Sequence, residues 1–510
     1  MAGLPADEGS AVASREVSLA LRNTLRLGLS LAVTFGVAFL VRFWLPRYLG
    51  PDTFGLVYFA EEFAAAFFVL GTLGVETYIH KEVSTRPALA SEFFGTFTLF
   101  RLLVGLGILG AMAVTLHGMG KSEIEWRLVA LFAAGQILFV HNSSLGAMLQ
   151  AVGTVGELAW IKAGAKVLWG VGIVTGLLIE RSFVEVIAIS FLVTEALRLP
   201  LLTRAARRHL GLRFTVRRQA LRLVLAASMP YFINYVAFRI YSKIDVSMLS
   251  YLTTDREVGW YGAAANVTAI VFLVLPLLNA VIIPMGARIA QTSEDAASAT
   301  MRGTLRMVLI LTVPMALLLA LNASTVVPLL FSSSYLPSVT AMQVLTPLVP
   351  LTYVCSMLGS HLVQLGRIWS VTSISLVGLV LNPVLNALLI VPVWRALGDG
   401  GAGIAAASTT VLTELVAAAL LFAALGRASW DRAQSLLLLK LVLVSALLGG
   451  AHLWLQRLGL LAIPVEIVLY VMLAAPLGAL PLRSMLQRVR HALRPRGSTP
   501  SPSDDQPESP

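Results

Sequence analysis

Long apolar stretches dominate this sequence, and they constrain the fold more than any other feature. A helix needs about 20 apolar residues to cross the hydrocarbon core of a bilayer. On that scale the 510-residue chain contains roughly fourteen spans. They are predicted near residues 24–45, 54–79, 92–116, 127–150, 158–179, 184–203, 222–250, 259–286, 304–330, 338–363, 368–394, 402–425, 434–455 and 459–482.

The composition agrees with this interpretation. Hydrophobic residues make up 57% of the chain and charged residues 13%, whereas a soluble protein carries roughly 45–50% and about 25%. We therefore predict an all-α polytopic membrane protein with about 14 transmembrane helices. This class excludes an ordinary soluble enzyme, a disordered protein and a nucleic-acid-binding domain.

The distribution of basic residues along the chain predicts its membrane topology. The formal net charge is +11 at pH 7. Sorted by predicted connection, roughly 23 Lys and Arg residues fall on one side of the membrane and 7 on the other. Cytoplasmic segments carry such an excess, so both termini are predicted to be cytoplasmic, as an even number of spans also requires. We expect a multi-pass protein of the cytoplasmic (inner) membrane, with no role in nucleic-acid binding.

A weak internal repeat relates residues 42–60 to residues 245–263. Each segment contains the end of a span, a tight outer turn and the start of the next span. The matching residues are offset by 203, or by one more for the glycines: Leu49 with Leu252, Tyr58 with Tyr261, and Gly55 with Gly259. Six spans per unit is an even number, so the two halves share one orientation, which is the parallel repeat of transporters.

The repeat predicts two six-helix lobes, near residues 15–210 and 215–426, followed by two additional helices near 432–482. Residues 1–14 form a polar N-terminal segment. Residues 483–510 are basic and then rich in Pro, Ser and acidic residues, which predicts a disordered cytoplasmic tail.

Four stretches carry a resemblance to a known family. They are Arg47–Gly55, Lys243–Leu252 with Val258–Ala264, Pro328–Leu345, and Asn382–Asn386 with Pro392 and Gly398–Ala406. Together they resemble the polysaccharide and oligosaccharide-lipid flippases (Wzx type) of the multidrug/oligosaccharidyl-lipid/polysaccharide exporter superfamily. The chain departs from that pattern at Ser332–Ser334, where the family usually has Gly with an acidic residue.

The resemblance implies a transporter without enzymatic activity. Its expected cargo is a polyprenyl-pyrophosphate-linked oligosaccharide, moved from the cytoplasmic to the outer leaflet by alternating access for cell-surface polysaccharide (O-antigen) biosynthesis. The lipid tail would stay among the membrane lipids while the head group crosses a central cavity. The resemblance also implies a monomer that works beside a glycan polymerase or glycosyltransferases, with the two additional helices bordering a groove for the tail.

Cationic side chains inside spans are the candidate ligands for a pyrophosphate, because charges in a membrane are costly and usually face a cavity or a partner. Arg239 lies seventeen residues into its predicted span, roughly 25 Å of helical rise. Tyr235, Arg239 and Lys243 share one helix face, which we interpret as a cavity wall with aromatic support for sugar. Asn234, Tyr241 and Asp245 share another face, predicted to pack on neighbouring helices. A buried salt bridge is the alternative for Arg239.

Arg42 and Arg101 complete the predicted substrate-binding set. Arg42 occupies the repeat position of Asp245, so we expect the two to attract each other across the lobe interface when the outer side is closed. The alternative for Arg42 is an extended side chain that reaches the outer interface. Lys162, Lys166 and Arg198 lie near the cytoplasmic edge and are expected to snorkel.

Acidic and amide side chains are the candidates for ion coupling. Glu61 and Glu62 are adjacent, so only one is expected to face the cavity; a carboxylate there takes up a proton more readily than one in water. A salt bridge to Arg42 or Arg101 is the alternative. Asp245, Asn382 and Asn386 complete the set, and Pro383 is expected to break its helix locally. We predict H+ or Na+ coupling, no cofactor and no metal site, since the histidines lack ligand spacing.

Three other functions remain open. A cation-coupled multidrug antiporter would need an acidic cavity, whereas these candidates are mostly basic. A polysaccharide polymerase or ligase generally carries a long external loop, and none is predicted. A scaffold without transport would leave the buried charges unexplained.

Overall fold

The computed structural model describes residues 6–72, 82–217, 232–272 and 293–480, together with positions 79, 229 and 289, and describes side chains from Gly28 onward. Every regular element in these residues is helical. Eleven segments among them are long and apolar enough to cross a membrane. The last of these holds two helices, and the predicted seventh and eighth spans are only partly described, so the arrangement agrees with about fourteen spans.

The first group of helices is called the N-lobe here. Its elements are α1 (Ala6–Leu49), α2 (Pro51–Thr72), the short η1 (Pro87–Leu89), α4 (Ala90–Gly118), α5 (Glu123–Ala151), α6 (Val155–Ile179) and α7 (Glu185–Leu210). Gly50, at φ +81°, makes the turn between α1 and α2, a conformation that costs glycine least. The helix α1 begins at Ala6, within the predicted polar N-terminal segment, and its Ala, Glu, Leu and Arg residues favour helix.

The second group is called the C-lobe. Residues 232–241 are helical and lead into α9 (Ile244–Leu252), α10 (Asp255–Val271), α12 (Glu294–Leu321), α13 (Ala323–Phe331), η3 (Ser333–Tyr335), α14 (Ser338–Leu345), α15 (Leu348–Gln364), α16 (Ile368–Leu397) and α17 (Gly401–Leu425). Two predicted spans are each divided into two helices, at Asn322 and at Thr346–Pro347.

The additional hairpin follows η4 (Gly426–Ser429). It consists of α18 (Arg432–Leu455), η5 (Gln456–Leu461) and α19 (Ala462–Ala474), and it packs on α12. A buried network fastens it: Glu466 Oε1 lies 2.6 Å from His452 Nδ1, and Asn322 Nδ2 donates to Glu466 Oε2 at 2.6 Å. These polar groups hold the hairpin against the C-lobe.

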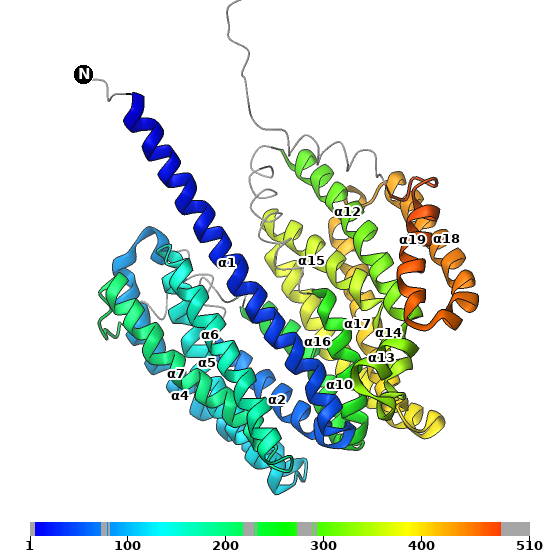
Figure 1. The fold of residues 1–510 in the computed structure, drawn as a ribbon, viewed down its shortest axis with the longest axis horizontal. Coiled ribbons are helices and arrows are strands. Elements are labelled where there is room, and N and C mark those ends of the chain that lie inside the picture. Colours follow the sequence, from blue (N-terminus) through cyan, green and yellow to red (C-terminus); the bar gives the residue numbers. More distant parts are fainter. Residues whose placement is uncertain are drawn as a thin grey trace, which may run out of the picture.

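The apolar cores show how the lobes meet. One core joins both lobes at the end that carries the α1–α2 and α9–α10 turns, with Phe54 and Tyr58 of α2 packed together with Trp260 of α10 and Phe331 of α13. At the opposite end each lobe has its own core, around Phe97 in the N-lobe and Leu305 in the C-lobe. Figure 1 shows the same arrangement, with the lobes drawn together where α2 and α10 lie. We call this the closed end.

Candidate functional site

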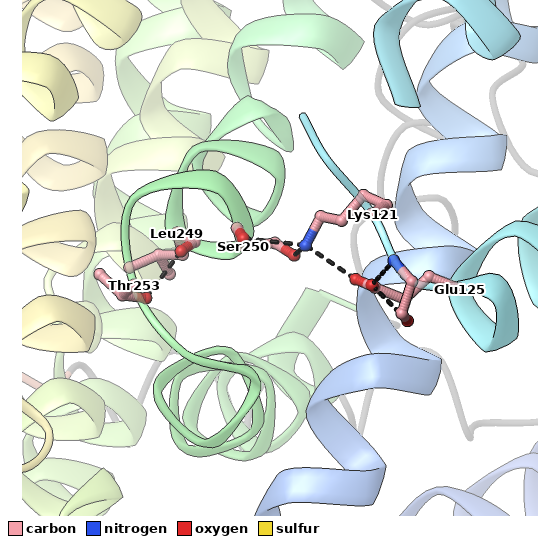
Figure 2. A network of polar contacts seen from close by, with 6 residues as sticks. Lys121, Glu125, Leu249, Ser250 and Thr253 are labelled. Atoms are coloured by element: carbon pink, nitrogen blue, oxygen red, sulfur yellow. Dashed lines mark hydrogen bonds and ion pairs between the residues drawn. The ribbon is translucent and has the colours of Figure 1, made fainter. Parts of the chain in front are cut away.

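A buried lysine links the two lobes at the closed end (Figure 2). Lys121, between α4 and α5, donates to Ser250 Oγ at 2.6 Å and to the Ser250 carbonyl at 2.9 Å. Its Nζ also lies 2.8 Å from Glu125 Oε1, and both side chains are less than a tenth exposed. The C-terminal end of α9 thus contacts a positively charged side chain of the N-lobe.

Three further bonds cross between the lobes at this end. The Tyr335 hydroxyl donates to the Pro46 carbonyl at 2.8 Å, and Arg47 donates to the Leu329 carbonyl at 2.9 Å. An exposed ion pair joins Arg256 Nε to Asp52 Oδ1 at 3.0 Å. Direct bonds and a shared core together shut this side of the molecule.

Deeper in the molecule, Lys243 forms an ion pair with Glu62 of the N-lobe at 2.6 Å. Its Nζ also lies 5.9 Å from the ring centroid of Tyr58. The chain leaves helical geometry at Lys243 (φ −137°, ψ −8°), so the single helix face predicted for Tyr235, Arg239 and Lys243 is interrupted there. Tyr235 is exposed and Arg239 half-buried.

A cavity of about 300 Å³ lies between the lobes beside this pair. Its charged lining consists of Arg42 from α1, Glu61 from α2 and Lys166 from α6, and Asn266 of α10 closes it on the C-lobe side. Glu61 therefore faces the cavity while its neighbour Glu62 holds Lys243. Lys166 was expected to snorkel; instead its Nζ lies 3.2 Å from the Trp169 ring centroid and faces this cavity. The Trp three residues away was the available signal.

Asp245 does not meet Arg42, and the expected attraction between them is not formed in this structure. Its side chain is 1% exposed and points into the C-lobe. There it accepts hydrogen bonds from the Tyr261 hydroxyl and, at 3.3 Å, from Thr410 Oγ1. The face predicted to pack on neighbours does so, since Tyr241 reaches Glu414 and Asn234 accepts a bond from Ser375.

The two amides of α16 adjoin this buried cluster. Asn386 Nδ2 donates to Asn382 Oδ1 at 2.8 Å, and Thr409 Oγ1 of α17 donates to Asn386 Oδ1 at 2.7 Å. Asn382 Nδ2 is buried without a hydrogen-bond partner among the described residues. The predicted break at Pro383 is wrong, because α16 continues through it from Ile368 to Leu397.

Arg101 occupies a different place from the cavity. It is buried among α2, α4 and α5, where it donates to the Gly71 carbonyl at 3.1 Å, the Val140 carbonyl at 3.2 Å and Ser144 Oγ at 2.5 Å. These bonds give the buried guanidinium its partners, which are backbone carbonyls of α2 and α5 and the hydroxyl of Ser144. Its role as an anion ligand stays a prediction, because Arg101 lies away from the cavity in this conformation.

Two family profiles match the sequence. One, described as polysaccharide biosynthesis protein, covers residues 20–290, just over half of the chain. The other, MatE, covers residues 230–388. Among curated proteins, none matches the chain significantly.

Solved structures share the fold. The chain is similar to an inward-facing multidrug resistance MATE family transporter of the MOP superfamily, with a TM-score of 0.61 and 15% identity over 79% of this chain and 98% of that one. It also resembles the lipid II flippase MurJ in an inward closed conformation (TM-score 0.59, 13% identity, 88% and 100%). A third is a MOP superfamily transporter from Pyrococcus furiosus, described as having a binding pocket of reversed polarity (TM-score 0.55, 13% identity, 80% and 96%). At these identities the likeness establishes the fold.

Proposed function

Because the chain belongs to the polysaccharide biosynthesis protein family, we propose that it is a flippase that carries a polyprenyl-pyrophosphate-linked oligosaccharide across the cytoplasmic membrane. The fold is that of membrane transporters of the MOP superfamily. The proposal adds the cargo, the direction from the cytoplasmic to the outer leaflet, and a monomeric protein that receives its cargo from glycosyltransferases.

One observation carries this proposal: the cavity between the lobes holds two cations, Arg42 and Lys166, against one carboxylate, Glu61. A phosphorylated head group loses hydration as it enters a membrane, and fixed cations there compensate for that loss. A cationic drug would gain nothing from such a lining. In the predicted topology the closed end is the outer one, so the cavity belongs to a cytoplasm-facing state.

Through the ion pair between Lys243 and Glu62, binding of the cargo can drive the change from one conformational state to the other. A pyrophosphate beside Arg42 competes with Glu62 for Lys243, which removes a bond between the lobes. Arg239 and Tyr235, on the preceding helix, then extend the site toward phosphate and sugar. Binding of the cargo therefore breaks a contact that exists in only one of the two conformational states. A ligand can shift the population of states only through such a difference.

The buried cluster around Asp245 is our candidate for ion coupling. Asp245, Thr410, Asn386 and Asn382 would offer oxygen ligands from α9, α17 and α16, which pairwise hydrogen bonds connect at this place. A proton or Na+ bound there neutralises a buried carboxylate, whose charge is costly in an apolar lobe. Occupation of this cluster would set the packing of α9 against α17 and thereby the position of Lys243.

A cation-coupled multidrug antiporter is the second candidate. The match of residues 230–388 to MatE and the likeness to a multidrug transporter favour it. It assigns Glu61 and Glu62 to a cationic drug. The two functions differ in the sign of charge that the cavity binds.

The test is reconstitution of the purified chain in vesicles with a fluorescent polyprenyl-pyrophosphate oligosaccharide and, separately, a cationic dye. We expect the lipid-linked sugar to become accessible in the opposite leaflet. Arg42→Gln should reduce that rate at least tenfold, whereas Lys440→Gln, on α18 and not among the residues that line this cavity, should not. Dye transport that depends on Glu61, with no movement of the lipid-linked sugar, would instead establish the antiporter.

A further inference from the structure

The chain that leads from the N-lobe to the C-lobe begins with a short segment, residues 211–217, which we call the strap. It follows the end of α7 and has no regular secondary structure. The backbone N–H of Arg213 donates to Ser91 Oγ at 3.1 Å, and the backbone N–H of Arg217 donates to Thr96 Oγ1 at 2.9 Å. Side chains from the first two turns of α4 thus hold the backbone of the strap.

The inner face of the strap fits closely on the N-lobe. A Cβ added to Gly95 would lie 2.4 Å from the Thr215 carbonyl oxygen, so α4 meets the strap where it lacks a side chain. Leu212 is buried in the N-lobe's own core. The Arg217 guanidinium pairs with Glu92 Oε1 at 3.0 Å. These contacts place the strap at the end of the N-lobe opposite the closed end.

The outer face of the strap is apolar and basic. Phe214 touches Phe94 edge-on, with ring centroids 6.1 Å apart, and still remains 62% exposed. Val216 is 48% exposed, and Arg213 is exposed as well. Apolar side chains beside a cation suit the boundary between headgroups and acyl chains, where the apolar groups are buried and the charge stays hydrated.

The same kind of surface continues along α7, whose length and apolar character suit a membrane span. Val193, Leu197 and Leu201 lie on one face of α7 and are between 45% and 52% exposed, as expected of side chains that contact lipid tails. Arg204 and Arg208, both exposed, lie in the same sector of about 80°, at about 100° per residue. The lipid-facing stripe therefore changes from apolar to basic over the last two turns of α7, where the helix reaches the headgroups.

The arginines of this surface are available to an external partner. Arg204, Arg208 and Arg213 are exposed and form no ion pair with a carboxylate of the described residues. Arg217 differs from them, because Glu92 holds it. A negatively charged membrane surface attracts such arginines, and each contributes about fivefold to the affinity. A soluble anion would use the charges but neither the exposed ring nor the apolar stripe.

We infer that the outer face of the strap and the last two turns of α7 bind the headgroups of anionic phospholipids, and that this binding keeps the strap docked on α4. A released strap would not hold Arg213 and Phe214 beside the stripe of α7. The lipid therefore binds the docked form more tightly and favours it. In the predicted topology these lipids belong to the cytoplasmic leaflet.

The position of the strap gives this binding a consequence for the whole molecule. The strap leads toward the helical residues 232–241, which carry Tyr235 and Arg239. Anionic lipid thus fixes the N-lobe end of the connection between the lobes. The inference goes beyond the proposed function, because it holds for any cargo and any direction of transport.

Lipid binding is tested with the full chain in phosphatidylcholine nanodiscs. Val216→Cys, in a Cys355→Ser background, carries a bimane fluorophore, and spin-labelled phosphatidylglycerol or spin-labelled phosphatidylcholine is the quencher. We expect the phosphatidylglycerol label to quench far more strongly at equal content. Arg204→Gln and Arg213→Gln should each reduce this preference about fivefold, whereas Arg204→Lys should keep most of it. The matched control, Arg457→Gln on η5, should leave the preference unchanged.

Docking of the strap is measured separately, by labelling Leu212→Cys with a neutral thiol reagent in the same Cys355→Ser background. This position is buried while the strap is docked. We therefore expect slow labelling when the nanodisc contains phosphatidylglycerol and several-fold faster labelling in phosphatidylcholine alone. Thr96→Val removes the acceptor of the Arg217 N–H. It should speed labelling in both lipids, which shows that the assay reports release of the strap.

Equal quenching by the two labelled lipids would overturn the lipid site. Displacement of the labelled lipid by inorganic pyrophosphate at constant ionic strength would also overturn it, because the surface would then be a general anion site. A labelling rate at position 212 that does not depend on the headgroup would overturn the link between lipid and docking. None of these measurements involves transport, so the proposed function stands or fails separately.

Discussion

Gly55 and Gly259 meet where α2 crosses α10, each against the backbone of the other helix. A Cβ on Gly55 would lie 1.7 Å from the Asp255 carbonyl oxygen, and one on Gly259 would lie 1.9 Å from the Pro51 carbonyl oxygen. Positions 51 and 55 are repeated 204 positions later at 255 and 259 (255 − 51 and 259 − 55), and each glycine contacts the other half's residue of the 51/255 pair, so the crossing is reciprocal under the internal repeat. Two helices approach this closely only where both lack a side chain, which makes the glycine pair the tightest part of the closed end.

Gly55→Ala should therefore prevent this closure. The added methyl meets backbone, which cannot rotate away, so the cost exceeds the ~1–3 kcal/mol typical of overpacking. We expect the lobes to separate at this end. Spin labels on cysteines introduced at positions 52 and 256, with Cys355 replaced by Ser, measure that distance. Gly107→Ala, on α4 with nothing within 4 Å of the new methyl, is the control; an unchanged distance in Gly55→Ala would contradict the prediction.

Lys121→Met should destabilise the closed end as well. It removes the charge that Ser250 and Glu125 share and leaves the Glu125 carboxylate buried without a cation, at a cost of about 3 kcal/mol. A cysteine introduced at position 253 should become more accessible to thiol-labelling reagents in this variant. Arg127→Gln, which removes ion pairs with Glu123 and Glu185 inside the N-lobe, should change little at the closed end. If both variants behave alike, the Lys121 contact contributes nothing to closure.

Exchange of the charges at the deeper ion pair tests its role as a contact between states. Lys243→Gln and Glu62→Gln should each lower transport, the first by removing a cation from the cargo site and the second by leaving Lys243 unpaired when the cargo is absent. The double exchange Lys243→Glu with Glu62→Lys restores the pair but moves the cation to α2. We expect it to recover the closed conformation, seen by the same spin-label distance, without recovering full transport. Recovery of neither property would argue against the pair as a link between lobes.

His452→Ala should loosen the additional hairpin. Glu466 is completely buried and would retain only its bond from Asn322, so a loss of about 3 kcal/mol is expected if the carboxylate stays charged. Thermal unfolding in detergent should shift to lower temperature. Glu466→Gln keeps the shape and the polar contacts and should recover most of that loss when combined with His452→Ala. His117→Ala, an exposed histidine on α4, serves as the control.

The helical membrane class, the number of spans and the repeat followed from the sequence because each is a local property. Apolar length determines whether a segment spans a bilayer, and identical residues at a fixed offset indicated the repeat before any contact was known. Gly55 and Gly259, paired at first only by alignment, are in contact in the structure.

Among the site residues, Arg42 and Glu61 reach one cavity as their chemistry suggested. The partners of Lys243, Asp245 and Arg101 could not be read from helix periodicity. The helix is interrupted at Lys243, which separates it from the face shared by Tyr235 and Arg239. Arg101 donates to carbonyls of α2 and α5, and no pattern along the chain shows which helices surround it.

The lengths of the apolar segments and the distribution of charges along the chain thus determined its class, which is a bundle of membrane helices in two related halves. Only the tertiary structure decided which charged side chains pair with one another and which face a cavity. The reason is that a charge in a bundle of packed helices takes its partner from helices far away in sequence, as Lys243 takes Glu62 and Lys121 takes Ser250. Lys166 of α6 faces a cavity because of how α1, α2 and α10 pack around it, and its own segment indicates this only through the nearby Trp169.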